Sequence, residues 1–247
     1  MNSIGRTALV TGSSSGIGYA VARDFLSQGW NVVLNGRNEE RLRKAAQKLD
    51  AAARLATVGG TTADAATGAS MVRVARERFG SVDVLVNNAG EFVGKPFLDV
   101  DGKELDHYVD VNLKGTYFTT QAAVRAMIDQ GRGGSIVNIT TVLTDHSISW
   151  VNASAPLVTK GAIRTLTVLL ASELAPHDIR VNAVAPGFVL TPLIDGPNID
   201  NLAKVSTMQR VGEADEIASA VRFLAESGFI TGHVMNVDGG FVTSRRT

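Results

Sequence analysis

Short apolar runs alternate along this chain with longer segments whose apolar residues recur every three or four positions. The runs lie at 7–10, 31–35, 82–89, 135–140 and 180–186. The segments with helical spacing are 16–29, 39–56, 66–80, 117–131 and 160–176. Short runs that are largely apolar are typical of strands buried on both faces of a sheet, and parallel neighbours need a crossover such as a helix. The pattern therefore predicts an α/β fold in three layers, with a parallel sheet between two layers of helices.

The alternation continues over residues 1–247 without a linker rich in proline or serine, so we expect one domain. With 45% hydrophobic and 19% charged residues, the composition is typical of a soluble globular protein. The formal net charge is zero and the basic residues are scattered, which argues against nucleic acid or an anionic membrane as a partner. The chain has no cysteine and four dispersed histidines, so we expect neither disulfides nor a metal site. It shows no signal-peptide pattern and no long apolar span, and we expect a cytoplasmic protein.

A glycine-rich loop, TGSSSGIG at 11–18, follows the first apolar run and opens the first helical segment. Gly12 suits the tight turn, while Gly16 and Gly18 allow the phosphates of a dinucleotide to approach the backbone N–H groups. The N-terminus of the following helix favours the negative charge of a pyrophosphate. A plain flexible turn is the alternative. The loop residues expected to contact a dinucleotide are Gly12, Ser14, Ser15, Gly16, Ile17 and Gly18.

Four further segments extend this motif along the chain. They are NNAG at 87–90, VNLKG around Asn112, TKGA at Lys160 and PG at 186–187. Together with the glycine-rich loop, in this order and spacing, they resemble the short-chain dehydrogenase/reductase family over essentially the whole chain. The resemblance implies a doubly wound sheet of the Rossmann type, a nicotinamide cofactor and a small-molecule substrate. It places Asn88, Ala89 and Gly90 on the ribose and adenine side of the cofactor, and Pro186, Gly187, Val189 and Thr191 beside the nicotinamide.

The residues at the end of the second apolar run lie where such a fold reads the 2′ position of the adenosine ribose. They are Asn35, Gly36, Arg37 and Asn38. A carboxylate there accepts hydrogen bonds from a free 2′-hydroxyl and repels a 2′-phosphate, whereas arginine offers a fork of charged donors to the phosphate. Because Gly36 removes the acid and Arg37 supplies the cation, the sequence predicts NADP(H) rather than NAD(H), with Arg37 and Asn38 at the cofactor. The alternative is that Arg37 only begins the next charged helix.

Near the adenine amino group, relatives usually have an aspartate, and this chain has Thr61 and Thr62. Both threonines are expected to contact the cofactor. The next acid, Asp64, precedes a helical segment, so we expect it to cap that helix.

The family's catalytic residues are an asparagine, a serine, a tyrosine and a lysine, and the resemblance carries only part of this set onto the chain. Asn112 and Lys160 match it, and Thr141 stands at the serine position, where its hydroxyl can still donate and accept a hydrogen bond. In the family the lysine binds the nicotinamide ribose and lowers the pKa of the tyrosine. Pro156 occupies the tyrosine position, four residues before Lys160, and no tyrosine follows Tyr117. We therefore expect a cofactor site without the phenol that transfers the proton.

Ser154 is not expected to replace the tyrosine. Residues four apart share a helix face, whereas six residues at about 100° each turn two side chains well apart. We expect Ser154 to be the N-cap of a helix that has Pro156 in its first turn, where the missing N–H costs little. In the preceding loop, Asp145 and His146 are the other acid and base candidates. Because imidazole can relay protons as a general acid or base, His146 is retained as a catalytic candidate, with an exposed loop histidine as the alternative.

Three functions are compatible with these residues. The first, which we favour, is NADP(H)-dependent hydride transfer to or from a small carbonyl or alcohol, with the proton supplied through Thr141, Lys160, His146 or water. The second is reduction of a C=N or activated C=C bond, because an iminium accepts hydride without prior protonation. The third is nucleotide binding without catalysis. By analogy with the family, we expect a homotetramer or homodimer, a C-terminal strand, and a lid over the nicotinamide from residues 191–210.

Overall fold

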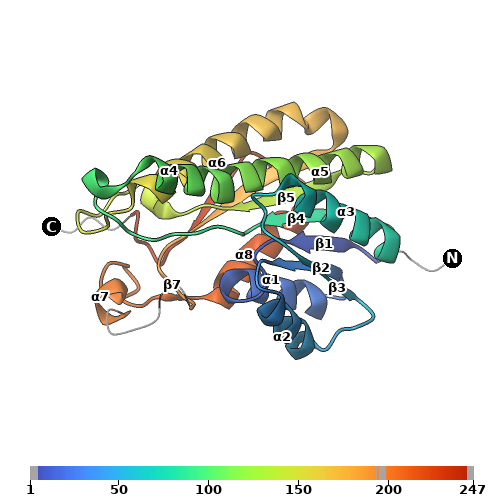
Figure 1. The fold of residues 1–247 in the computed structure, drawn as a ribbon, viewed down its shortest axis with the longest axis horizontal. Coiled ribbons are helices and arrows are strands. Elements are labelled where there is room, and N and C mark those ends of the chain that lie inside the picture. The colour runs from blue at the N-terminus through green and yellow to red at the C-terminus, as the bar shows by residue number, and fades with distance from the viewer. Residues whose placement is uncertain (1–4, 193, 195–198, 244–247) are drawn as a thin grey trace.

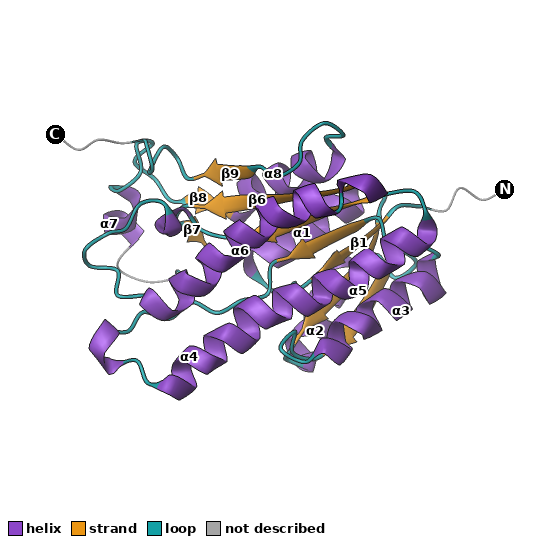
Figure 2. Cartoon of the chain, turned by 90° about the horizontal axis from the view of Figure 1, so that it is seen from above, coloured by secondary structure: helices purple, strands orange, loops and turns teal. Residues whose placement is uncertain are grey.

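The computed structural model of the protein describes residues 5–192, 194 and 199–243, and its centre is a parallel sheet with helices on both faces (Figure 1, Figure 2). The seven strands lie in the order β3-β2-β1-β4-β5-β6-β9. Their bounds are β1 Thr7–Val10, β2 Asn31–Gly36, β3 Leu55–Gly59, β4 Val84–Asn87, β5 Gly134–Ile139, β6 Ile179–Pro186 and β9 Val234–Val237. The expected three-layer α/β fold, a doubly wound sheet of the Rossmann type, is confirmed.

Two layers of helices enclose the sheet. The α-helices are α1 Gly16–Ser27, α2 Glu39–Leu49, α3 Ala65–Phe79, α4 Gly102–Tyr108, α5 Gly115–Gln130, α6 Ser154–Glu173, α7 Ile199–Ala203 and α8 Ala214–Glu226. A π-helical segment, Val109–Lys114, joins α4 to α5 without a break. Buried side chains of α1, α2 and α8 share one apolar cluster, and those of α3, α5 and α6 share another. These two clusters are the interfaces between the sheet and its helix layers.

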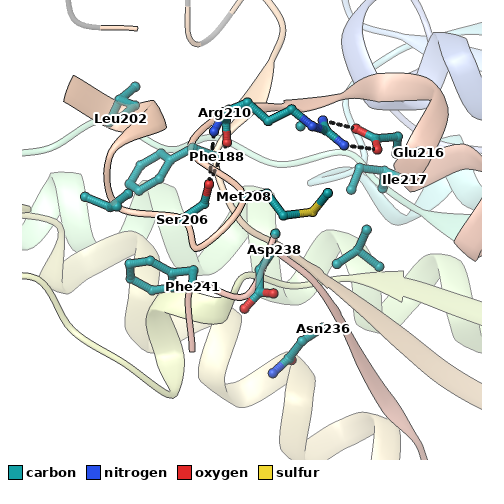
Figure 3. A pocket seen from close by; sticks show the side chains of 14 residues that line it. Phe188, Leu202, Ser206, Met208, Arg210, Glu216, Ile217, Asn236, Asp238 and Phe241 are labelled. Carbon is teal, nitrogen blue, oxygen red and sulfur yellow. Dashed lines mark hydrogen bonds and ion pairs between the residues drawn. The ribbon is translucent and has the colours of Figure 1, made fainter. Parts of the chain in front are cut away.

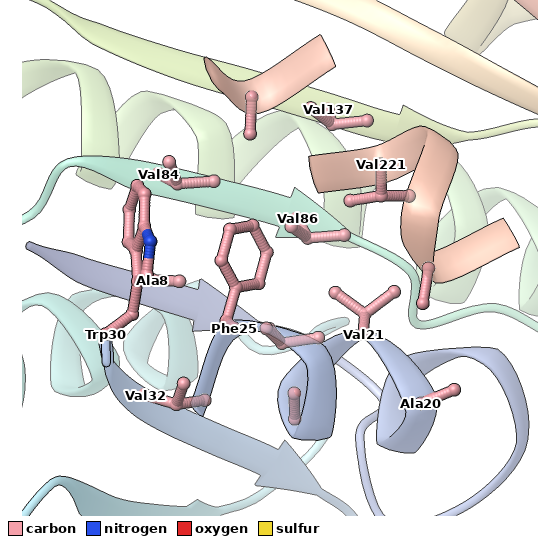
Figure 4. Close-up of a cluster of buried hydrophobic side chains, with 14 of the residues drawn as sticks. Ala8, Ala20, Val21, Phe25, Trp30, Val32, Val84, Val86, Val137 and Val221 are labelled. Atoms are coloured by element: carbon pink, nitrogen blue, oxygen red, sulfur yellow. The ribbon is translucent and has the colours of Figure 1, made fainter. Parts of the chain in front are cut away.

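Successive residues of the central strands face opposite layers, as the pleat of a strand requires. In β1, Ala8 and Val10 belong to the cluster under α1 and α8, while Leu9 belongs to the other. Figure 4 shows the first cluster, where Phe25 of α1 packs against Trp30 with ring centroids 4.9 Å apart. Complete burial of a side chain such as Phe25 stabilises the fold by about 1.5–3 kcal/mol. The sheet is thus a well-packed support for the loops at its carboxyl edge.

The strand order reverses between β1 and β4. From β1 the chain proceeds outward through β2 to β3, and it then returns to β4 and proceeds through β5 and β6 in the other direction. Ligands of doubly wound sheets bind at the carboxyl ends of the strands where the order reverses. The loops that meet there are the glycine-rich loop after β1 and residues 88–91 after β4. Beyond β6, a short parallel pair, β7 Val189–Leu190 and β8 Gly212–Glu213, extends the structure on the same side.

Several sequence predictions are wrong in detail. The helix expected at 39–56 ends at Leu49, because Asp50 adopts a left-handed conformation with φ of 44°, and Leu55 begins β3. Alanine-rich residues 51–53 favour a helix locally, but the sheet recruits the segment that follows them. Helices α4 and α8 and the π-helical segment lie outside every helix that the pattern indicated.

Two predictions about helix ends have different outcomes. Asp64 is the N-cap of α3, and its carboxylate accepts a hydrogen bond from Ala66 N at 2.9 Å, as expected. Ser154 is the first residue of α6 rather than its N-cap, and the N-cap residue Ala153 has no side chain that can cap. Pro156 lies in the first turn of α6, as expected, where its missing N–H breaks no hydrogen bond of the helix.

Candidate active site

The glycine-rich loop packs directly on the segment after β4. A Cβ atom at Gly12, whose φ is +62°, would lie 2.8 Å from Ala89 Cα. A Cβ atom at Gly18 would lie 2.5 Å from the Gly12 carbonyl oxygen. Both separations are shorter than a van der Waals contact, so any side chain at either position would displace the backbone of the loop.

Side chains outside the glycine motif fix the shape of this loop. The Thr11 hydroxyl accepts hydrogen bonds from Asn88 N at 3.0 Å and Ala89 N at 2.9 Å. In return, Asn88 Nδ2 donates to the carbonyls of Thr11 and Gly12 at 3.0 and 2.9 Å. Asn35, which is buried at the end of β2, accepts from Gly12 N at 3.4 Å. Sequence reasoning placed Thr11 in the glycine-rich loop and Asn35 near the 2′ position but assigned neither of them a contact with the loop. It gave Asn88 a contact with cofactor rather than with the loop.

A cavity of about 280 Å³ opens beside the loop, at the carboxyl ends of β4, β5 and β6. Apolar side chains such as Phe92, Leu143 and Phe188 form much of its wall, as is usual for sites that bind small molecules. More than half of the residues expected at the cofactor or in catalysis line it. They are Ser15, Gly16, Ile17, Asn88, Gly90, Thr141, Lys160, Pro186, Gly187, Val189 and Thr191.

Lys160 is one of two charged residues that line this cavity, and Glu91 is the other. The Lys160 side chain comes from α6 and is 8% exposed, and Nζ donates a hydrogen bond to the Ile139 carbonyl at 2.8 Å. A Cβ atom at Gly90 would lie 3.2 Å from Nζ, so the backbone of Gly90 lies against the amine. Burial lowers the pKa of Lys160 from 10.5 to about 8. The amine therefore changes its charge within about one pH unit of neutrality.

Asn112 holds the segment after β4 against α6. It is fully buried in the π-helical segment, a distortion that is frequent at functional sites. Its Oδ1 accepts from Glu91 N at 2.8 Å, and its Nδ2 donates to the Glu91 carbonyl at 3.1 Å and to the Thr159 hydroxyl at 3.0 Å. Thr159 in turn donates to the Pro156 carbonyl at 2.7 Å. Asn112 thus lies next to the cavity and shapes it, but it is not among the described residues that line it.

Thr141 is the hydroxyl residue at the end of β5. Its oxygen accepts a hydrogen bond from Leu143 N at 3.3 Å, which leaves the hydroxyl hydrogen for a ligand in the cavity. Pro156 is buried one helical turn before Lys160. No tyrosine is among the described residues that line the cavity. Of the residues expected in catalysis, the cavity therefore contains one hydroxyl, that of Thr141, and one amine, that of Lys160.

The residues expected at the 2′ position of the ribose and near the adenine amino group lie outside this cavity. The guanidinium of Arg37 forms an ion pair with Glu91, a residue that the sequence did not single out. The side chain of Asn38 caps α2 by accepting from Arg41 N at 2.9 Å. Thr62 is buried and Thr61 accepts from Ala63 N at 3.3 Å. Gly12, Ser14, Gly18 and Ala89 also lie outside the cavity lining.

The structure does not bring His146 into the cavity. His146 is exposed, and its ring contacts Phe241 edge-on at a centroid distance of 5.4 Å. The neighbouring Asp145 forms an ion pair with Arg164 at 2.6 Å. Trp150 stacks on Phe188 at 6.2 Å and so supports the cavity wall from outside. A proton from His146 would have to reach the cavity through water.

Phe188 also lines a second cavity of about 250 Å³ (Figure 3). This second cavity is lined by the apolar side chains of Met208 and Phe241 and by Asp238. At its rim, Arg210 donates two hydrogen bonds, of 2.6 and 2.7 Å, to Glu216, which lowers the pKa of Glu216 to about 2.

Residues from the expected lid, 191–210, contribute to the walls of both cavities. Positions 193 and 195–198 of that lid lie outside the described residues.

Within the described part of the chain, no helix is long and apolar enough to span a lipid bilayer. The same residues contain no cluster of three or more histidine, aspartate or glutamate side chains that could hold a metal ion.

Comparison with known proteins identifies the family. Residues 12–242 match a family model described as "Enoyl-(Acyl carrier protein) reductase". The chain is 38% identical over 246 residues to the short-chain reductase protein NovJ of Streptomyces niveus, covering 94% of this chain and 92% of that protein. It is 39% identical over 252 residues to the L-rhamnose 1-dehydrogenase (NAD(P)(+)) of Azotobacter vinelandii, with 96% of each covered.

Solved structures agree with these sequence matches. The crystal structure of a short-chain type dehydrogenase/reductase from Mycobacterium marinum superimposes with a TM-score of 0.90 at 31% identity, covering 96% of this chain and 95% of that chain. The motifs, the sheet order and the matches over nearly the full length lead to one assignment: the chain belongs to the short-chain dehydrogenase/reductase family.

Proposed function

We propose that this protein is an NADP(H)-dependent oxidoreductase that transfers hydride to or from a small carbonyl or alcohol substrate without a tyrosine as proton source. Its family consists of dehydrogenases and reductases, which makes a nicotinamide cofactor and an oxidoreductase function the starting point. The observation that carries the specific proposal is Lys160, a buried amine with a pKa of about 8 that shares one cavity with the Thr141 hydroxyl.

The residues around the crevice fit a dinucleotide. Helix α1 begins at Gly16 with no capping side chain and no acid in its first turn, so its N–H groups remain free for a phosphate. The absence of side chains at Gly12 and Gly18 gives the loop its close fit to the segment after β4. Arg37 at the end of β2 provides the cation for a 2′-phosphate. Thr191 and Val189 would flank the nicotinamide, and the bound cofactor would donate or accept hydride there.

Proton transfer falls to the residues of the cavity. The Thr141 hydroxyl would donate a hydrogen bond to the substrate oxygen, and Lys160 would supply the proton in the direction of reduction. A donor whose pKa lies near the working pH is suited to this task, because a useful fraction is protonated and the proton is released readily. His146 is the second source that the sequence suggested, and it would act through water because its ring lies outside the cavity lining.

A second candidate function is reduction of a C=N or activated C=C bond. The absence of tyrosine from the described cavity lining favours it, since an iminium carbon accepts hydride without prior protonation. The family model's description, which names an enoyl reductase, is compatible with the C=C variant. Phe92, Val142 and Phe188 give this cavity the apolar walls that such substrates need.

Cofactor binding followed by a substrate panel tests the proposal. We expect NADPH to bind more tightly than NADH and to be oxidised in the presence of at least one ketone, imine or enone. Thr141→Val should lower kcat by about 10²-fold, the usual cost of removing one such donor. His146→Ala tests one proton source, because an unchanged kcat excludes His146 and leaves Lys160, Thr141 or water. Tight NADPH binding without turnover of any substrate class would instead indicate a protein that binds nucleotide without catalysis.

A further inference from the structure

The ion pair between Arg37 and Glu91 crosses the dinucleotide crevice. Arg37 follows β2 directly, and Glu91 lies four residues beyond the end of β4. Strand β1 lies between β2 and β4 in the sheet, and the glycine-rich loop begins at its end. Neighbouring strands are about 4.8 Å apart, so the pair spans roughly twice that distance over the carboxyl end of β1. A dinucleotide bound at the loop would lie beside this pair.

Both the backbone and the side chain of Glu91 are held in place. Its backbone N–H and carbonyl are fixed by Asn112, as described above. One carboxylate oxygen pairs with Arg37 and the other lies 2.7 Å from Nε2 of His107 on α4. The Glu91 side chain is 25% exposed and that of Arg37 is 59% exposed. The negative charge therefore belongs to the wall of the crevice, while the guanidinium reaches it from solvent.

The charge of Glu91 persists at neutral pH. Burial by itself raises the pKa of Glu91, but the hydrogen bond with His107 and the charge of Arg37 outweigh it and hold the pKa below 4.5. Arg37 thus faces a carboxylate acceptor in the protein without cofactor. That acceptor offers the guanidinium the same bonding that a phosphate would offer.

We propose that Glu91 determines cofactor preference by competing with the 2′-phosphate of NADP(H) for Arg37. The proposal rests on the function above, in which Arg37 reads the 2′ position. NADP(H) must exchange the pair between Arg37 and Glu91 for one between Arg37 and phosphate, and it must tolerate the nearby carboxylate. NAD(H) lacks the phosphate and leaves the pair intact. Glu91 therefore narrows the preference for NADP(H) that Arg37 creates.

The expected effect is modest because Arg37 is more than half exposed. Partly exposed ion pairs change an equilibrium by a factor of about two to five, and relief of the repulsion between carboxylate and phosphate adds to this. We expect Glu91→Gln to tighten NADPH binding about fivefold. The substitution keeps the size of the side chain and its backbone contacts with Asn112, so it tests the charge alone.

Dissociation constants of NADPH and NADH, measured by fluorescence, test the competition. The variants are Glu91→Gln, Arg37→Ala, the double variant, and the matched control Glu77→Gln, whose carboxylate pairs with Arg73 on the exposed face of α3. Thermal unfolding checks that each variant is folded. We expect a fivefold gain for NADPH in Glu91→Gln, less than a twofold change for NADH, less than a twofold gain in the Arg37→Ala background, and no change in the control.

The binding constants distinguish failure of the competition between Glu91 and phosphate from failure of the proposed function. If the wild type prefers NADPH and Arg37→Ala abolishes this preference, but Glu91→Gln leaves NADPH binding unchanged or weaker, Glu91 does not compete and only this inference is overturned. If the wild type does not prefer NADPH and Arg37→Ala has no effect, the assignment of Arg37 to the 2′-phosphate is overturned together with the inference.

Discussion

Replacing Lys160 with methionine should stabilise the folded protein at neutral pH. The amine is buried, its hydrogen bond goes to the Ile139 carbonyl, and it forms no ion pair with a described carboxylate. A buried ammonium without a counterion loses hydration that the protein does not replace. Methionine has a similar length and volume but no charge to desolvate. The same variant should lose hydride transfer, because it removes the proposed proton source. A gain in stability with a loss of activity is the usual trade-off at active-site residues.

The size and sign of the effect follow from the pKa. A fall from 10.5 in the unfolded chain to about 8 in the folded one corresponds to about 3 kcal/mol of destabilisation below pH 8. Loss of the donor to the Ile139 carbonyl offsets about 1–2 kcal/mol, so the net gain at pH 7 is about 1–2 kcal/mol. Between pH 8 and 10.5 the unfolded chain binds more protons than the folded one, so wild-type stability rises with pH in that window. The advantage of Lys160→Met should therefore shrink by about 2 kcal/mol between pH 7 and 9.5.

Urea unfolding followed by circular dichroism, at pH 7.0, 8.5 and 9.5 and one protein concentration, measures this difference. Lys48→Met on the exposed face of α2 is the control for alkaline effects, and its difference from the wild type should stay constant with pH. A difference between Lys160→Met and the wild type that does not vary with pH would refute the reasoning, because it would mean that burial does not lower the pKa of Lys160.

Two further substitutions probe the phenol and the loop. Pro156→Tyr places a phenol one helical turn before Lys160 and should raise kcat/KM for carbonyl reduction about 10²-fold at unchanged NADPH affinity. If a folded variant showed no gain, the site would differ from the family's in more than the missing phenol. Gly18→Ala places a Cβ atom 2.5 Å from the Gly12 carbonyl oxygen and should cost about 2–4 kcal/mol of unfolding free energy and most NADPH affinity. Gly161→Ala in α6, where a Cβ atom meets nothing within 4 Å, should instead stabilise by about 0.5–1 kcal/mol, and equal melting temperatures of the two variants would refute the steric argument.

The sequence predicts the fold best where local signals agree with tertiary packing. Strand β1 has the expected bounds because all of its residues are buried and the glycine-rich loop ends it. The end of α2 is unexpected because an aspartate, Asp50, rather than a glycine adopts the left-handed conformation. Strand β3 is recognised as a strand only by its pairing with β2, which the local sequence does not encode.

In the candidate site, too, local motifs predict some features, and others depend on tertiary structure. Motifs bring Gly90, Thr141 and Lys160 to one cavity, because each follows or faces the carboxyl end of a neighbouring strand. The contact between Arg37 and Glu91 joins residues far apart in the sequence and depends on the order of β2, β1 and β4. No periodicity or motif encodes that order. The direction of a loop side chain such as His146 is equally inaccessible to pattern reasoning.

Isotope transfer tests the central claim, that hydride transfer occurs in a cavity without a phenol, most directly. NADPH carrying deuterium at the transferable position would be incubated with the protein and with a ketone, an imine and an enone in turn, and the products analysed by mass spectrometry. We expect one deuterium on the product carbon for at least one class, with none formed by Lys160→Met. Saturating NADPH binding with no deuterium in any product would contradict the claim.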